Sequence, residues 1–186
     1  MPNEETRENA HATEGPYPVP GNWRWGKGNV LFKPMEVRRP IEKTFLYIDI
    51  DAIDNKRQII SAPKLLSADE APSRAVRGVQ CGDTLFSMVR PYLKNIAFVS
   101  EQLKDAIASS GFYVCRPRQC TDARYIYRLM TSPYVVDGLN VHMKGDNSPS
   151  IRKNDIEEFL FPVPPLSEQR RIVERVERLF AKLDAA

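Results

Sequence analysis

The stretch GDTLFSMVRPYLKNIAFV, residues 82–99, decides how this chain folds. It contains two β-rich runs, residues 84–89 and 96–99, on either side of a turn that a proline stiffens. A third run of the same kind, FYVC at residues 112–115, follows a glycine that is typical of a turn. The pattern predicts short strands that pair with one another inside a globular domain.

Further elements lie outside this stretch. Residues 45–50, FLYIDI, form another strand candidate, and residues 159–163 close the domain with a short one. Residues 122–130 predict a helix with Thr121 or Asp122 as its N-cap, and a proline three residues later breaks or restarts it. Strands and helices together predict an α/β (α+β) domain.

The C-terminal segment differs from the rest of the chain in its helix-forming composition. Residues 167–183 follow two prolines, contain neither glycine nor proline, and are rich in strong helix formers. Ser167 suits the N-cap and Glu168 the first turn, where a negative charge meets the helix dipole. The apolar residues of this segment are spaced four, three and four apart, and they are Ile172, Val176, Leu179 and Leu183. The segment is predicted to be an amphipathic helix that packs either on its own domain or on a partner helix.

The length of 186 residues allows one globular domain with an appendage. We expect a disordered and then extended start at residues 1–20, a domain at residues 21–163, and the spacer helix at residues 164–186. No stretch approaches the roughly 20 apolar residues of a membrane span, and the polar, acidic N-terminus differs from a signal peptide. The expected compartment is the cytoplasm.

Charge and cysteine content exclude few of the possible functions. Residues 1–15 hold four glutamates and one arginine, so the rest of the chain is more basic than its net charge of +3 indicates. Such a balance permits nucleic-acid binding without requiring it. The three cysteines, at positions 81, 115 and 120, fit no zinc-site spacing, and we expect no metal site.

Candidate catalytic groups are few. Asp49, Asp51 and Asp54 are the densest carboxylates of the domain, and Asp49 with Asp51 would share one face of a strand, as a metal-dependent nuclease requires. No Glu-x-Lys element accompanies them. The prolines at 164 and 165 follow Val163 and precede Leu166, so they lack the polar and aromatic neighbours of an amino-methyltransferase loop. We expect no catalytic residues, with a small nuclease as an alternative.

Two segments carry side chains that suit DNA recognition. The turn after residue 89 holds Arg90, Tyr92, Lys94 and Asn95. Arginine can bind guanine and asparagine can bind adenine through two hydrogen bonds each, while lysine meets phosphates. The composition of residues 139–150 is typical of a loop, in which Lys144, Asn147 and Ser148 offer similar groups. The alternative for both segments is an ordinary solvated surface.

Several motifs in the same order resemble one known family. The runs GDTLFSMVRPYLKNIAFV and IASSGFYVCRP, at 82–99 and 107–117, resemble the middle of the recognition domains of Type I restriction-modification specificity subunits. FPVPPLSEQRRIVERVERLF at 161–180 is similar to the start of their conserved helix, and NWRWGKGNV and YIDIDAI are similar to the opening of the domain. The resemblance covers roughly residues 20–186. Lys27, Asn29 and Phe161 depart from the usual leucine, acidic and aliphatic residues.

The resemblance implies a non-catalytic target-recognition domain whose projecting helix forms an antiparallel coiled coil with a second recognition module. It implies double-stranded DNA, methyltransferase subunits and a restriction subunit as partners. S-adenosylmethionine, ATP and magnesium would then belong to those subunits. Members with two recognition domains would be about twice as long, so this chain is expected to recognise one half of a bipartite target. A protein that only assembles such a complex, without DNA contact, is a further alternative.

Overall fold

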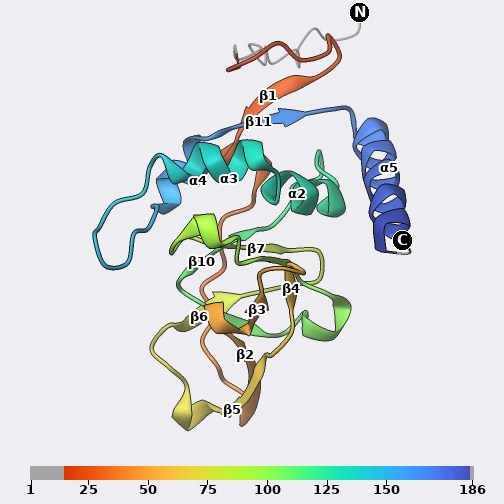
Figure 1. Ribbon diagram of the computed structural model, residues 1–186. Coiled ribbons are helices and arrows are strands. Elements are labelled where there is room, and N and C mark those ends of the chain that lie inside the picture. Colours follow the sequence, from red (N-terminus) through yellow and green to blue (C-terminus); the bar gives the residue numbers. More distant parts are fainter. Residues whose placement is uncertain (1–14, 185–186) are drawn as a thin grey trace, which may run out of the picture.

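The computed structural model describes residues 15–184, and Figure 1 shows their arrangement. A layer of short helices lies above a three-stranded sheet, a four-stranded sheet lies below it, and the long helix α5 (Leu166–Asp184) stands at one side. The α/β class is confirmed. Of the disordered and extended start predicted at residues 1–20, residues 1–14 fall outside the described residues. None of the helices within residues 15–184 combines the length and apolar character needed to cross a membrane.

The central sheet is built from residues 82–99 together with the strand at residues 112–115. β7 (Thr84–Ser87) pairs antiparallel with β10 (Phe112–Cys115) on one side and with β8 (Ile96–Phe98) on the other. Alternate residues of these strands point to opposite faces, and both faces are buried. Phe86 packs into the core below the helices, whereas its neighbour Leu85 packs into the core toward the second sheet. The sheet therefore separates two hydrophobic cores.

The four-stranded sheet has the order β5-β2-β9-β6. These strands are β5 (Lys64–Ser67), β2 (Thr44–Ile48), β9 (Ile107–Ser109) and β6 (Ala75–Gly78). β2 and β9 run parallel, and the other pairs are antiparallel. A small hairpin, β3 (Ile53–Asp54) and β4 (Ile59–Ile60), leaves this sheet and packs beside β8.

The helical layer contains α1 (Gly28–Leu31), α2 (Ala123–Met130), α3 (Pro133–Asn140) and α4 (Lys153–Glu158). The predicted cap is confirmed, because Asp122 Oδ1 accepts the N–H groups of Arg124 and Tyr125 at 2.9 and 3.1 Å. The two ends of the domain meet where β1 (Arg24–Lys27) pairs with β11 (Leu160–Val163), and α5 leaves from that point.

Four local predictions need correction. The strand expected at residues 84–89 ends at Ser87, and Val89 forms only an isolated bridge with Ser150. The strand expected at residues 45–50 ends at Ile48, because Asp49 Oδ1 accepts the N–H of Ile50 at 2.8 Å and starts the 3₁₀ helix η1 (Ile50–Ala52). Ser167 is not an N-cap, since α5 already begins at Leu166. The loop expected from residue 139 begins only at residue 141, after α3.

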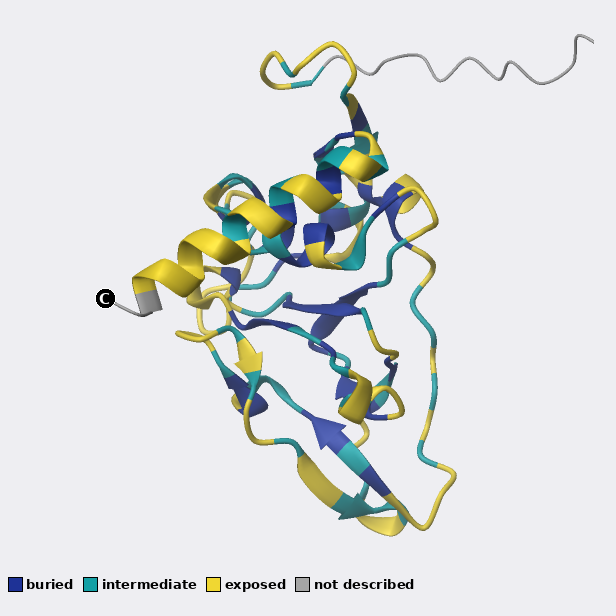
Figure 2. Cartoon of the chain, turned by 90° about the vertical axis from the view of Figure 1, so that its right-hand side faces the viewer, coloured by how far each residue is buried: buried dark blue, intermediate teal, exposed yellow. Residues whose placement is uncertain are grey.

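The first half of α5 is anchored to the domain. Val173 is buried in the core that lies against α2, and Gln169 is fully buried beside it. The side chain of Gln169 donates to the carbonyls of Cys120 and Pro164, at 3.1 and 2.9 Å, and accepts the N–H of Asp122 at 2.7 Å. Figure 2 shows the outer side of α5 and its C-terminal end as exposed. One glutamine thus joins the helix to the cap of α2.

Replacing Gln169 by leucine should lower the free energy of unfolding by about 3 kcal/mol, because one buried and two partly buried backbone groups would lose their partners. Urea denaturation of the two proteins would measure the difference. Gln102→Leu, at an exposed position, serves as the control and should change stability by no more than about 0.5 kcal/mol. Equal effects of the two substitutions would show that the Gln169 contacts do not hold the helix in place.

Candidate nucleic-acid interface

The predicted recognition turn is a strained 3₁₀ turn at the end of β7. Pro91 begins the helix η3 (Pro91–Leu93), and the residues on its two sides, Arg90 and Lys94, are left-handed, with φ of 47° and 55°. Such conformations cost free energy in residues other than glycine, and they are found where structure or function requires them. Arg90, Tyr92 and Lys94 are all exposed. Their side chains therefore lie on one short, fixed segment.

The predicted loop lies against this turn. Val89 and Ser150 form an antiparallel bridge, and the N–H of Arg90 donates to the carbonyl of Pro149 at 2.8 Å. The guanidinium of Arg90 also donates from Nη2 to the carbonyl of Asn147 at 2.7 Å. Because these contacts join segments more than 50 residues apart, the turn and the loop form one surface. We call it the turn–loop surface, and it comprises residues 90–94 and 144–150.

Most of the predicted site residues are exposed on this surface. Lys144, Asn147 and Ser148 are exposed in the loop, as Tyr92 and Lys94 are in the turn. Within residues 15–184, neither Lys94 nor Lys144 has a carboxylate within ion-pair distance. Asp146 is the one acidic side chain of the loop. The surface therefore offers cations, an amide and a hydroxyl to a ligand.

Asn95 does not belong to this exposed set. It is 7% exposed, and its carbonyl accepts the N–H of Ser87 at the junction of β7 and β8. A side chain buried to that extent cannot form two hydrogen bonds with a base edge unless the turn opens. The expectation that Asn95 lies beside Arg90 on the binding surface is wrong. Asn95 is buried beneath the turn, where its carbonyl bonds to β7.

The carboxylates expected on one strand face each have other partners. Asp49 caps η1, Asp51 forms an ion pair with Lys64 at 2.6 Å, and Asp54 Oδ1 accepts two backbone N–H groups. The shared face was wrong because the strand ends before Asp49. No group of three or more histidine, cysteine, aspartate or glutamate side chains within residues 15–184 could hold a metal ion.

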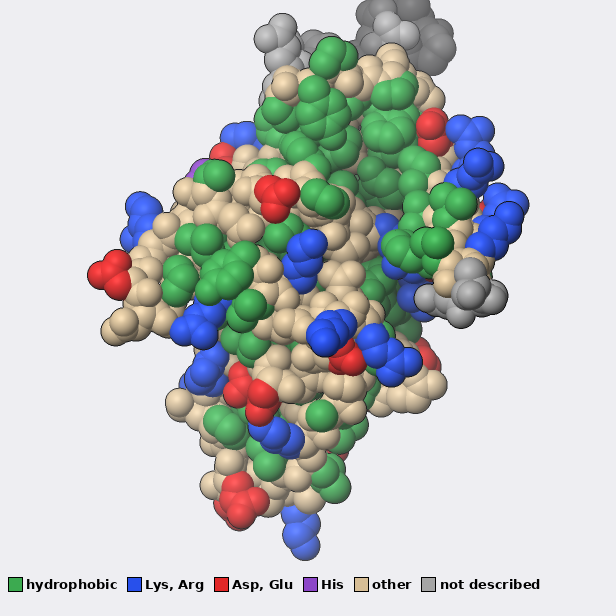
Figure 3. Space-filling model, in the orientation of Figure 1, with side chains coloured by type: hydrophobic (Ala, Val, Ile, Leu, Met, Phe, Trp, Pro, Cys, Tyr) green, Lys and Arg blue, Asp and Glu red, His purple; other side chains and the backbone are tan. Residues whose placement is uncertain are grey.

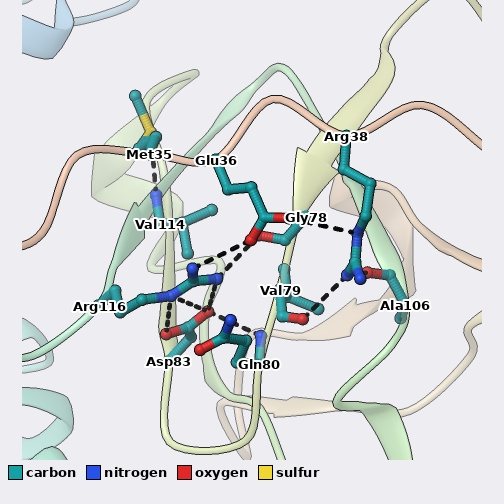
Figure 4. A network of polar contacts seen from close by, with 10 residues as sticks. All are labelled: Met35, Glu36, Arg38, Gly78, Val79, Gln80, Asp83, Ala106, Val114 and Arg116. Atoms are coloured by element: carbon teal, nitrogen blue, oxygen red, sulfur yellow. Dashed lines mark hydrogen bonds and ion pairs between the residues drawn. The ribbon is translucent and has the colours of Figure 1, made fainter.

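A buried ion network supports the start of β7 and was missed by the sequence analysis. Arg116 donates from Nε and Nη2 to the carboxylate of Asp83, at 2.9–3.2 Å, and from Nη1 to Glu36 at 3.1 Å (Figure 4). Burial raises the pKa of Asp83, and the pairing with Arg116 opposes that rise. No local pattern reveals this network, because its three members come from distant parts of the sequence.

Comparison with known proteins identifies the family. The family described as Type I restriction modification DNA specificity domain matches residues 82–185. The chain belongs to this family. The match begins at the stretch that forms the central sheet and ends within the residues that follow α5, so the resemblance noted from the sequence is confirmed.

One curated relative and two solved structures resemble this chain over most of its length. The Type I restriction enzyme EcoDI specificity subunit of Escherichia coli is 26% identical over 168 residues, which are 89% of this chain and 36% of that protein. The crystal structure of the HsdS subunit from Thermoanaerobacter tengcongensis matches with a TM-score of 0.86 and 39% identity, over 93% of this chain and 46% of that one. A chain solved in work on complex assembly and conformational transition of the type I R-M system matches with a TM-score of 0.85 and 38% identity, over 91% and 45%.

The specificity family therefore accounts for the architecture, including the long C-terminal helix. This chain spans about half the length of the solved relatives and about a third of the curated one. Phe161 is fully buried and packs against Phe32 and Phe159. Its aromatic ring thus fills part of the core between β11 and α1.

Proposed function

We propose that this chain is a sequence-specific DNA-recognition module of a Type I restriction-modification complex, and that it recognises one half of a bipartite target. The observation that carries the proposal is the turn–loop surface. The turn and the loop both carry side chains that suit DNA binding. They lie together, and Arg90 joins them. A rigid pair of segments with unpaired donors suits contact with base edges and phosphates.

We assign the exposed members of the surface as follows. Lys94 and Lys144 meet phosphates, because they are cations without acidic partners among residues 15–184. Tyr92, Asn147 and Ser148 offer hydrogen bonds to bases or phosphate oxygens. Arg90 keeps donors that the Asn147 carbonyl does not use, so it can both hold the loop and contact a base.

The second half of the target comes from another module, which pairs with α5. The side chains of Gln169, Val173 and Phe180 face the domain, whereas the stripe Ile172, Val176, Leu179 and Leu183 lies roughly 70° around the helix. Ile172 packs against the domain core and Val176 is half-buried, whereas Leu179 and Leu183 are 50% and 71% exposed. The exposed C-terminal half of this stripe suits an antiparallel partner helix, either of a second copy or of a sister half-subunit.

The chemistry of the complex belongs to its other subunits. We propose methyltransferase and restriction subunits as partners in the cytoplasm, with S-adenosylmethionine, ATP and magnesium bound there, and a non-catalytic role for this chain. Asp49 caps η1 and Asp51 pairs with Lys64, and this use of both carboxylates disfavours the nuclease alternative. Magnesium-dependent cleavage by the isolated chain, lost in Asp49→Asn, would revive it. An assembly protein without DNA contact would show no sequence preference at any salt concentration.

Selection from a pool of random DNA duplexes tests the proposal directly. The wild-type chain should enrich one short sequence, and Arg90→Ala should weaken binding to that sequence by about 1–3 kcal/mol. Binding to scrambled duplexes should change little, so the specificity ratio should fall. The melting temperature should stay close to that of the wild type, because the Arg90 contact is exposed.

Asn147→Ala tests the assigned contact of the Asn147 side chain apart from Arg90. It removes the amide but keeps the carbonyl that accepts the Arg90 hydrogen bond. Binding to the selected duplex should therefore weaken while the loop keeps its link to Arg90, and binding at the wild-type level would contradict the assignment of Asn147. If stability and DNA binding fall together in Arg90→Ala, the residue is structural and its assignment to base contact is wrong.

A further inference from the structure

We infer that the tip of the β3–β4 hairpin, together with Arg124 on α2, forms a second DNA contact that binds the phosphate backbone beside the turn–loop surface. This hairpin strip comprises Lys56, Arg57 and Arg124. The inference rests on the proposed function and extends it to residues that no comparison assigns. It concerns backbone phosphates and not base edges.

The hairpin tip is held in one conformation. Asp54 Oδ1 accepts the N–H groups of both Lys56 and Arg57 at 3.0 Å, which closes the turn. Gln58 is left-handed, with φ of 56°, and its carbonyl accepts the hydroxyl of Tyr127 at 3.0 Å. Only three non-glycine residues within residues 15–184 have positive φ, and the other two are Arg90 and Lys94. Strained backbone is thus confined to the turn and to this tip.

The strip continues from the turn along β8. Lys94 precedes β8, β4 packs beside that strand, and Phe98 at its far end lies 5.9 Å from the ring of Tyr127. Arg124 stacks on the same Phe98, with its guanidinium 3.9 Å from the ring centre. Lys94 and Phe98 are four positions apart in the sequence, so their Cα atoms lie within about 13 Å of each other. That reach covers at most about four base-pair steps along the DNA axis.

The cations at the tip are free to bind an anion. Lys56 and Arg57 are exposed, and neither has a carboxylate within 4.0 Å in the described part of the chain. Several other exposed lysines of the domain are neutralised by ion pairs, as Lys27, Lys64 and Lys104 are. Figure 3 shows lysine and arginine side chains across the middle of this face, below a largely hydrophobic area.

The chemistry of the strip favours phosphate over bases. Its three members, Lys56, Arg57 and Arg124, are all exposed cations, and such cations suit the phosphate charges that every DNA sequence presents. Each phosphate that a cation neutralises releases counterions, and the affinity then depends more steeply on salt. A strip of this kind should add affinity for every duplex and leave the preference for one sequence unchanged.

The experiment compares Lys56→Ala/Arg57→Ala with the control Arg39→Ala/Lys43→Ala, a second exposed arginine and lysine away from β8. Dissociation constants are measured over a range of salt concentrations for two duplexes, namely the sequence that the wild type selects and a scrambled one. The hairpin variant should reduce the slope of log K against log salt by about two, equally for both duplexes. The control should keep the wild-type slope.

The outcomes separate this inference from the proposed function. An unchanged slope in Lys56→Ala/Arg57→Ala, with sequence-selective binding by the wild type intact, would overturn the hairpin contact alone. A fall in the specificity ratio of this variant would also overturn it, since the strip would then contact bases. A wild-type chain that binds no duplex would overturn the proposed function and the hairpin contact together. Melting temperatures of all variants confirm that the hairpin remains folded.

Discussion

Replacing Arg116 by methionine should lower the free energy of unfolding by about 3–5 kcal/mol at neutral pH. The side chain of Arg116 is only 11% exposed, and that of Asp83 is 2% exposed. Methionine fills much of the space but leaves the Asp83 carboxylate buried with only the N–H of Gln80 as a donor, at 2.8 Å. The carbonyl of Gly78 also loses its bond from Nη2. Chemical denaturation at pH 7 would measure the loss.

The loss should depend on pH in a definite direction. Burial raises the pKa of Asp83 in the folded protein, and without Arg116 nothing of comparable strength opposes that rise. A carboxyl whose folded pKa lies above its unfolded value contributes stability that is present at low pH and lost as pH rises through the folded pKa. The destabilisation by Arg116→Met should therefore be smaller near pH 4 than at pH 7.

Two controls test the origin of this effect. Asp83→Asn/Arg116→Met removes both charges, so it should be more stable at pH 7 than Arg116→Met alone, and its loss should vary little with pH. Lys104→Met breaks the exposed pair with Glu101, which lies at 2.7 Å, and should cost no more than about 1 kcal/mol. If the double variant were as unstable as the single one, the unpaired carboxylate would not be the cause.

The central sheet could be predicted from the sequence because its signals are local. Alternating apolar residues and a proline in the turn determine β7 and β8, and the capping carboxylate of Asp122 determines the start of α2. The strand at residues 45–50 was predicted too long by two residues, because Asp49 bonds to its own backbone. That competition between side chain and strand leaves no trace in hydrophobic periodicity.

The candidate site was predictable in its parts but not as a whole. The turn and the loop were each recognisable from their side-chain chemistry, and their contact depends on the bridge between Val89 and Ser150, which is a tertiary feature. Burial removed Asn95 from the set, and the hairpin with Lys56 and Arg57 was missed because an Asx turn between two short strands gives a weak pattern. Sequence periodicity likewise located the α5 stripe without showing which face the domain covers.

The exposed leucines of α5 are predicted to determine how the chain associates with a partner helix. Leu179→Glu/Leu183→Glu should abolish pairing of the chain through α5 and lower the association constant by at least about 100-fold. Each leucine that a partner helix covers contributes about 1.5–3 kcal/mol, and a pair of identical helices buries Leu179 and Leu183 of both copies, which makes four leucines. Sedimentation equilibrium would show a dimer for the wild type and a monomer for the variant.

The stability of the single module should not change in this variant. Leu179 and Leu183 are largely exposed, while the contacts that hold α5 to the domain come from Gln169, Val173 and the stacking of Arg128 on Phe180 at 4.9 Å. Ala181→Glu/Lys182→Glu adds two glutamates to exposed positions on another side of the helix and should leave the dimer intact. A wild-type monomer at every concentration would contradict pairing with a second copy. Dimers that survive Leu179→Glu/Leu183→Glu would contradict pairing through the stripe, because two modules facing each other through α5 cannot form over four buried carboxylates.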